Sequence, residues 1–290
     1  MRARQPHDLD GTDLVLSHFT LGRHHDIEDR VRASAAAGCS GLGLYVGDYR
    51  RLEDSGFAPN GLAELFDQHG QCLAEIEVLR GWADSASADS ADYRELESTA
   101  WRMADRFACR YVQAIGPYTG SIADAGRAYA SLCDRAADHG LVVGLEFLPF
   151  TNIFSAADAL AVVEAADRDN GGICVDIWHH ERGAADLEII RGIPASRVMG
   201  IQMSDGPIVP DNDDYYEDCL RNRRPPGDGE FDVSGFVEAL RGVGADAPWS
   251  LEVCDEEVWA TDGEAHVSRC AESMRAFLDR AMSPRRGSGR

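Results

Sequence analysis

Short apolar runs alternate along the chain with longer stretches in which apolar residues recur at helical spacing. The β-rich runs occupy residues 14–21, 41–46, 72–79, 111–117, 142–148, 172–178, 198–204 and 249–254. Ala-rich patterns between them, such as 92–109, 121–139 and 155–168, predict amphipathic helices. Gly38, Gly70 and Gly140 follow helical patterns and indicate helix ends that lead into the next strand.

Strand–helix units of roughly 30 residues predict an α/β protein folded as a (β/α)8 barrel. A doubly wound open sheet is the alternative, but no Gly-rich nucleotide-binding turn follows the first strand. No linker divides the chain, so we expect one barrel domain over residues 1–282 and a solvated tail at 283–290. Residues 206–231 form a long insertion after the seventh strand, and a loop of this length is usually functional or disordered.

Composition excludes several classes of chemistry. The 290 residues include 28 basic side chains, all of them arginine, against 50 acidic ones, for a net charge of −22. Without lysine there is no Schiff-base catalysis, no lysine-anchored pyridoxal phosphate and no Walker-A phosphate loop. The acidic balance argues against a nucleic-acid partner, since binding phosphates requires a basic face.

The cysteines and the apolar segments suggest a location for the protein. The eight cysteines are scattered singly, which argues against a disulfide framework or a zinc knuckle. The N-terminal residues lack the apolar core of a signal peptide, and no apolar run approaches the roughly 20 residues of a membrane span. We therefore expect a reduced, cytoplasmic setting and no membrane partner.

Polar residues stand within four consecutive strands of the second half of the chain. Glu146, Asp176, Gln202 and Glu252 are each flanked by apolar residues that would be buried. A single buried acid could be an edge residue or a salt-bridge partner, but four in register, at the barrel end where active sites lie, favour a metal site. Because all four donors are oxygens, we expect Mg²⁺ or Mn²⁺.

The motifs around these residues resemble the xylose isomerase-like sugar phosphate isomerase/epimerase superfamily. They read G-L-E-F-L-P-F, V-D-I-W-H, I-Q-M-S-D-G, R-R-P-P-G-D-G-E-F-D and S-L-E-V. The resemblance implies a TIM barrel holding one divalent metal ion through Glu146, Asp176, Gln202 and Glu252. It also implies that Glu146 and Glu252 are the catalytic acid/base pair. Barrels of this kind are often oligomers, so a homo-oligomer or a hetero-subunit is a further implication.

Three functions remain open at this stage. The first is an isomerase or epimerase that abstracts a proton next to the carbonyl of a sugar, a polyol-derived ketone or a sugar phosphate. The second is a lyase, similar to a 3-dehydroshikimate dehydratase or a C-glycoside deglycosidase subunit. Gln202 favours the lyase, because most epimerase-like members have His where this chain has Gln. The third is a non-catalytic sugar-binding subunit.

Two segments of the second half supply candidates for substrate binding. By the D-x-x-H resemblance, His179 binds or polarises a substrate oxygen, although a solvated loop histidine is the alternative. Arg223 matches the arginine of the R-x-x-P-G pattern, and the adjacent Arg224 could replace it. Either arginine could hold a substrate by bidentate hydrogen bonds, or could merely pair with loop acids such as Asp211.

The first half offers weaker signals. His18 closes the first apolar run, Glu77 and Arg80 stand at the end of the third, and Gln113 lies in the fourth. Each is placed where a barrel strand opens into the active-site end, so each is a candidate for lining the pocket.

Overall fold

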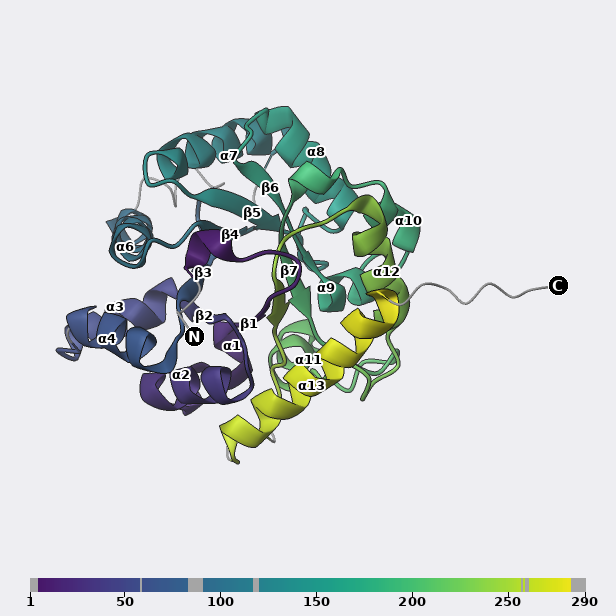
Figure 1. The fold of residues 1–290 in the computed structure, drawn as a ribbon. Helices are drawn as coiled ribbons and strands as arrows, with labels where there is room; N and C mark the ends of the chain where they lie inside the picture. The colour runs from purple at the N-terminus through teal and green to yellow at the C-terminus, as the bar shows by residue number, and fades with distance from the viewer. Residues whose placement is uncertain are drawn as a thin grey trace.

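The computed structural model describes residues 5–57, 59–82, 91–116, 120–256, 258 and 261–282. Eight parallel strands close into a barrel in sequence order, with helices around it (Figure 1). The predicted (β/α)8 fold is therefore confirmed. The predicted tail at 283–290 and position 117 of the fourth run lie outside the described residues.

The strands match the apolar runs closely. They are β1 (Leu14–Leu16), β2 (Gly41–Tyr45), β3 (Leu73–Leu79), β4 (Tyr111–Ile115), β5 (Val142–Glu146), β6 (Gly171–Asp176), β7 (Val198–Met203) and β8 (Trp249–Leu251). Two runs are much longer than their strands: β1 stops at Leu16 and β8 at Leu251. Ser17 accepts a hydrogen bond from the backbone N–H of Phe19 and caps a short helix, so His18 starts a helix instead of continuing the strand.

Helices follow most strands and form the outer layer of the barrel. They are α1 (His18–Leu21), α2 (Ile27–Ala36), α3 (Val46–Asp54), α4 (Pro59–His69), α6 (Ala91–Phe107), α7 (Ile122–Ala137), α8 (Ala156–Ala166), α9 (Ile177–Arg182), α10 (Leu187–Arg191), α11 (Tyr215–Arg221), α12 (Val233–Val243) and α13 (Gly263–Met282). Short 3-10 turns lie at Pro6–Asp8, Gly22–His24 and Ala195–Arg197. Within the described ranges, no helix is long and apolar enough to cross a membrane.

Helix ends follow local chemistry that the sequence already displays. Ser121 and Ser155 each form a reciprocal capping box with the aspartate three residues later, which starts α7 and α8. Gly140 has φ +68°, in the left-handed region, and it ends the turn after α7 as expected. The apolar faces of the outer helices pack on the strands, and Tyr129 of α7, Phe236 of α12 and Trp249 of β8 are fully buried.

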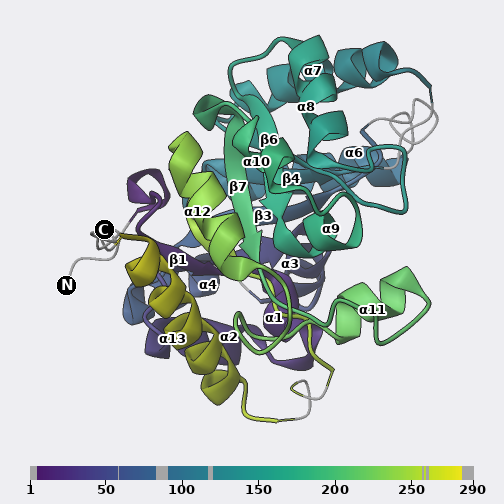
Figure 2. The same ribbon diagram turned by 90° about the vertical axis from the view of Figure 1, so that its right-hand side faces the viewer.

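The insertion at 206–231 is ordered, and it contains α11. Figure 2 shows α11 standing away from the ring of helices. The buried carboxylate of Asp205 closes the loop by accepting backbone N–H groups from Gly206, Gly227 and Phe231 at 2.7–3.0 Å. A Cβ on Gly229 would lie 2.2 Å from Asp205 Oδ1, so the backbone of the P-G-D-G segment can approach this carboxylate only because residue 229 is glycine. The loop is thereby fixed at the active-site end of the barrel.

Candidate active site

The four predicted strand-end residues come together at one end of the barrel. The register pairs Asp176 with Gln202 across β6 and β7, and Glu146 with Cys174 across β5 and β6. Glu252 follows β8 directly, and its backbone N–H donates to the Met203 carbonyl at 3.0 Å. All four residues are at most 5% exposed. Burial of three carboxylates side by side is costly unless cations or donors compensate them.

The two carboxylate oxygens of Asp176 have different partners: one caps a helix and the other contacts site residues. Oδ1 accepts the backbone N–H of Trp178 at 2.7 Å and caps α9. Oδ2 lies 3.0 Å from Arg223 Nη1 and 3.4 Å from His179 Nε2; these two residues line the cavity, whereas Asp176 itself does not. The helix cap fixes the orientation of the carboxylate, so Oδ2 is held in a defined place.

Arg223 bridges two of the acids. Its Nη1 lies 2.9 Å from Glu252 Oε2 as well as 3.0 Å from Asp176 Oδ2, and the side chain is only 2% exposed. Burial alone would lower the pKa of Arg223, but Asp176 and Glu252 raise it well above its ordinary value. Arg224 instead forms an exposed ion pair with Asp211 at 2.9 Å and does not line the cavity. The geometry therefore favours Arg223 over Arg224 for contact with a ligand.

Gln202 presents its amide in a specific orientation. Its Nε2 donates to Glu252 Oε1 at 3.2 Å, while its Oε1 accepts from Gln113 Nε2 at 3.1 Å. The Cys174 thiol also donates to this oxygen at 3.3 Å. The oxygen that would bind a metal thus points away from the carboxylates in this arrangement.

Glu77 is joined to the site through Ser17. The Ser17 hydroxyl lies 2.9 Å from Glu77 Oε2 and 3.3 Å from Glu252 Oε1, and the backbone N–H of His18 donates to Glu77 Oε1 at 3.0 Å. Glu77 itself does not line the cavity. Glu77 therefore reaches the site only through the Ser17 hydroxyl, which also lies next to Glu252. That hydroxyl has one proton and can donate it to only one of the two carboxylates at a time.

His179 lies between two acids and the insertion. Its Nε2 is 3.4 Å from Glu146 Oε1 and 3.4 Å from Asp176 Oδ2, and its Nδ1 is 2.5 Å from the hydroxyl of Tyr215. At 3% exposure it is not a solvated loop histidine. Ligand atoms of Glu146, Asp176 and His179 all lie within 4.8 Å of one another, a spacing that one metal ion can bridge.

Buried acids dominate the electrostatics of this end of the barrel. Burial raises the pKa of Glu75 to about 8, even though the Ser250 hydroxyl donates to it at 2.7 Å. Burial also raises the pKa of Glu77 and Glu252 well above their ordinary values, and neighbouring carboxylates add to both shifts. Repulsion of this kind is what a bound cation would relieve.

The donor set fits a divalent ion after one local rearrangement. Glu146, Asp176 and Glu252 supply anionic oxygens. Gln113 Oε1 is buried without a hydrogen-bond partner among the residues the structure describes. If both amides turn over, Gln202 Nε2 donates to that orphaned oxygen and Gln202 Oε1 faces the acids. In that arrangement Gln113 Oε1 gains a donor, and an oxygen of Gln202 is available to a metal beside the carboxylates.

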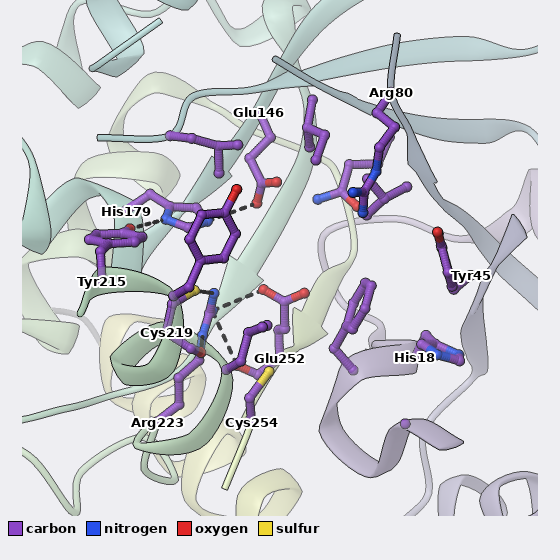
Figure 3. A pocket seen from close by; sticks show the side chains of 18 of the residues that line it. His18, Tyr45, Arg80, Glu146, His179, Tyr215, Cys219, Arg223, Glu252 and Cys254 are labelled. Carbon is purple, nitrogen blue, oxygen red and sulfur yellow. Dashed lines mark hydrogen bonds and ion pairs between the residues drawn. The ribbon is translucent and has the colours of Figure 1, made fainter. Parts of the chain in front are cut away.

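A cavity of about 490 Å³ opens over these groups. Among the predicted site residues, His18, Gln113, Glu146, His179, Arg223 and Glu252 line it. Figure 3 shows Glu146, His179, Arg223 and Glu252 grouped together, with Arg80, Tyr45 and His18 on the other side of the open space. Phe150, Tyr216 and Leu220 add an apolar wall. The cavity therefore has a polar floor, an aromatic side and a separate basic side.

Several lining residues have no counterpart in the sequence prediction. Cys219 and Cys254 flank Arg223, and the Cys219 sulfur lies 3.2 Å from Arg223 Nη2. Tyr45 and Arg51 come from the junction of β2 and α3 and from α3 itself. The end of the second apolar run was a usable signal for Tyr45, but nothing in the local pattern distinguishes Arg51 from other helical arginines.

Comparison with known proteins identifies relatives of the whole barrel. A family model described as a xylose isomerase-like TIM barrel matches residues 31–277. A solved structure described as the IOLI protein with a binding zinc atom superposes with a TM-score of 0.82 at 18% identity. The superposition covers 94% of this chain and 100% of that one, and at this identity it establishes the fold alone.

Curated relatives match about half of the chain. A 3-dehydroshikimate dehydratase of Pseudomonas aeruginosa is 32% identical over 148 residues, which are 51% of this chain and 23% of that protein. An inosose isomerase of Bacillus velezensis is 24% identical over 151 residues, which are 51% of this chain and 52% of that protein. The chain thus covers well under two thirds of the length of either relative.

Proposed function

The chain belongs to the xylose isomerase-like TIM barrel family, and we propose that it abstracts a proton next to the carbonyl of a polyhydroxylated ketone, with a divalent metal ion as cofactor. The main form of the proposal is an isomerase or epimerase. One observation supports it above the others: Glu146 from β5 and Glu252 after β8 both point into one cavity, as Figure 3 shows. Two carboxylates that reach a substrate from different strands provide a base on one side and an acid on the other.

The surroundings of Glu252 suit it to the acid role. In the absence of a metal ion, burial raises the pKa of Glu252, which favours its carboxyl as the proton donor of the pair. Glu146, next to His179, is then the candidate base. Return of the proton to the opposite face gives an epimer, and return to the neighbouring carbon gives an isomer.

Other side chains would bind and orient the substrate. His179 Nε2 and Arg223 point toward the acids and would donate hydrogen bonds to a substrate oxygen. The aromatic wall around Phe150 and Tyr216 would exclude water from the reacting carbon. A metal ion held by Glu146, Asp176, Glu252 and the turned Gln202 would stabilise negative charge on the carbonyl oxygen as a Lewis acid. The mainly oxygen donor set favours Mn²⁺ or Mg²⁺ over zinc.

A lyase is the second candidate, and Gln202 favours it. The same proton abstraction, followed by expulsion of a β-hydroxyl, dehydrates a cyclic hydroxy-ketone instead of inverting it. The dehydratase relative from Pseudomonas aeruginosa is more similar in sequence than the inosose isomerase relative. An assembly with a second copy or with another subunit stays a prediction.

Deuterium exchange tests the proposal directly. Protein stripped of metal and reloaded with Mn²⁺ is incubated in D₂O with inosose or 3-dehydroshikimate. We expect metal-dependent deuterium at the carbon next to the carbonyl, lost in Glu146→Gln and Glu252→Gln but kept in Glu188→Gln, an exposed acid outside the cavity. NMR identifies epimer or isomer, and ultraviolet absorbance identifies an aromatic dehydration product. Binding of a ketone with no exchange would instead support a non-catalytic sugar-binding subunit.

A further inference from the structure

We propose that Arg51 and Arg80 form a subsite for an anionic group, a carboxylate or a phosphate ester, on the substrate that reacts at the carboxylate end of the cavity. The inference rests on the proposed function and narrows its substrate class. Both arginines line the same cavity as Glu146 and Glu252. Neither contacts the acids of the candidate metal site.

Arg80 is positioned by the end of a strand. It follows β3 directly, its side chain is exposed, and Figure 3 shows it reaching into the cavity on the side of Tyr45. Within the described part of the chain, no carboxylate forms an ion pair with it. An exposed guanidinium without an ion-pair partner can donate two parallel hydrogen bonds to an oxyanion of a ligand.

Arg51 shares its carboxylate partner with a second arginine. The buried Asp48 carboxylate contacts both Arg30 Nη2, at 3.0 Å, and Arg51. Arg30 Nη1 also lies 2.9 Å from His18 Nδ1. Because a guanidinium only donates, that histidine nitrogen accepts and is unprotonated. Two guanidiniums therefore share the Asp48 carboxylate, and Arg51, the one of the two that lines the cavity, is 52% exposed and open to a ligand.

The two ends of the cavity are thus oppositely charged. Carboxylates come from β5, β6 and the end of β8, whereas Arg51 and Arg80 come from the neighbouring β2 and β3 units. In a chain of net charge −22, a locally basic wall is a specific attraction for an oxyanion. A substrate with its ketone at the acids and its anionic group at the arginines would fit both ends, whereas a neutral polyol ketone would leave the guanidiniums unmatched.

Binding measurements separate this inference from the proposed reaction. Calorimetry on the Mn²⁺-loaded protein compares 3-dehydroshikimate and a ketose phosphate with the neutral ketone inosose. We expect Arg80→Gln and Arg51→Gln each to weaken binding of an anionic ketone by about tenfold, with inosose changed less than twofold. Arg80→Lys should restore part of the affinity. If the arginine variants lose more affinity for 3-dehydroshikimate than for the ketose phosphate, the natural group is a carboxylate; the opposite order identifies a phosphate.

Arg50→Gln is the matched control, because Arg50 is the neighbouring helical arginine and pairs with Glu95 outside the cavity. Thermal melting confirms that each variant is folded. Equal losses for anionic and neutral ketones, or losses no larger than in Arg50→Gln, would overturn the subsite. If anions bind through the arginines but nothing exchanges deuterium, the proposed reaction fails and the subsite stands. If only inosose binds and exchanges, the subsite fails and the reaction stands.

Discussion

The hydroxyl of Tyr215 lies 2.5 Å from Nδ1 of His179, and the two rings stack with centroids 6.1 Å apart. On the other side of the imidazole, Nε2 faces oxygens of Glu146 and Asp176. Because carboxylates accept hydrogen bonds, Nε2 bears a proton. Burial raises the pKa of Tyr215, so its phenol stays protonated and donates to Nδ1. The insertion helix α11 therefore fixes the tautomer of a histidine on α9.

Tyr215→Phe should lower kcat for the exchange reaction about tenfold with a smaller change in KM, because the imidazole loses its fixed orientation and tautomer. Steady-state deuterium exchange measures both constants. Tyr216→Phe is the matched control, since it removes a hydroxyl from the adjacent tyrosine of the same helix but keeps the aromatic ring that lines the cavity. A Tyr215→Phe enzyme with the activity of the control would show that the contact only packs the loop.

Gln202→His should change which metal the site prefers. An imidazole nitrogen in place of an amide oxygen favours Zn²⁺ over Mn²⁺, and we expect the ratio of the two affinities to shift by at least about tenfold. Competition titrations against a chelator measure that ratio. Gln113→Leu removes only the partner of the amide and should leave the preference unchanged. An unaltered ratio in Gln202→His would place residue 202 outside the metal's coordination shell.

Gly43→Ala should destabilise the fold and disturb the site together. A Cβ at this position would lie 1.6 Å from Oε1 of Glu77, so that buried carboxylate has to move away from Ser17. We expect a loss of about 1–3 kcal/mol in the free energy of unfolding, measured by urea denaturation. Gly242→Ala, where nothing lies within 4 Å on an exposed part of α12, should be neutral or stabilising by up to about 1 kcal/mol. Similar effects of the two substitutions would contradict the close approach.

His266 should make the fold sensitive to mild acid. Burial lowers its pKa to about 4, from an ordinary value near 6.5, so the unfolded chain binds a proton more readily than the folded one between these values. Stability is thus full above about pH 6.5 and falls by roughly 3 kcal/mol as the pH drops to 4. His266→Gln should flatten this part of the stability profile, whereas His69→Gln, at an exposed position, should not. Parallel profiles for the wild type and His266→Gln would refute the assignment.

The sequence by itself determined the barrel and the positions of its acids. Alternating apolar runs and helical patterns predict eight strand–helix units, because each strand must bury both faces and each helix one face. Once the strands are placed, Glu146, Asp176, Gln202 and Glu252 necessarily meet, since the same ends of parallel strands lie at the same edge. Glycines such as Gly140 and caps such as Ser155 are local signals and need no tertiary information.

Only the tertiary structure shows which residues orient the site's side chains and which arginine lines the far side of the cavity. The tyrosine that orients His179 comes from an insertion, and the hydroxyl that joins Glu77 to Glu252 comes from the other end of the chain. Arg51 resembles Arg50 in sequence, yet only Arg51 lines the cavity. Such contacts depend on closure of the barrel and on the path of the loop, which bring distant residues within hydrogen-bonding range. Local periodicity fixes which way a strand or helix faces, but it does not fix which distant side chain it meets.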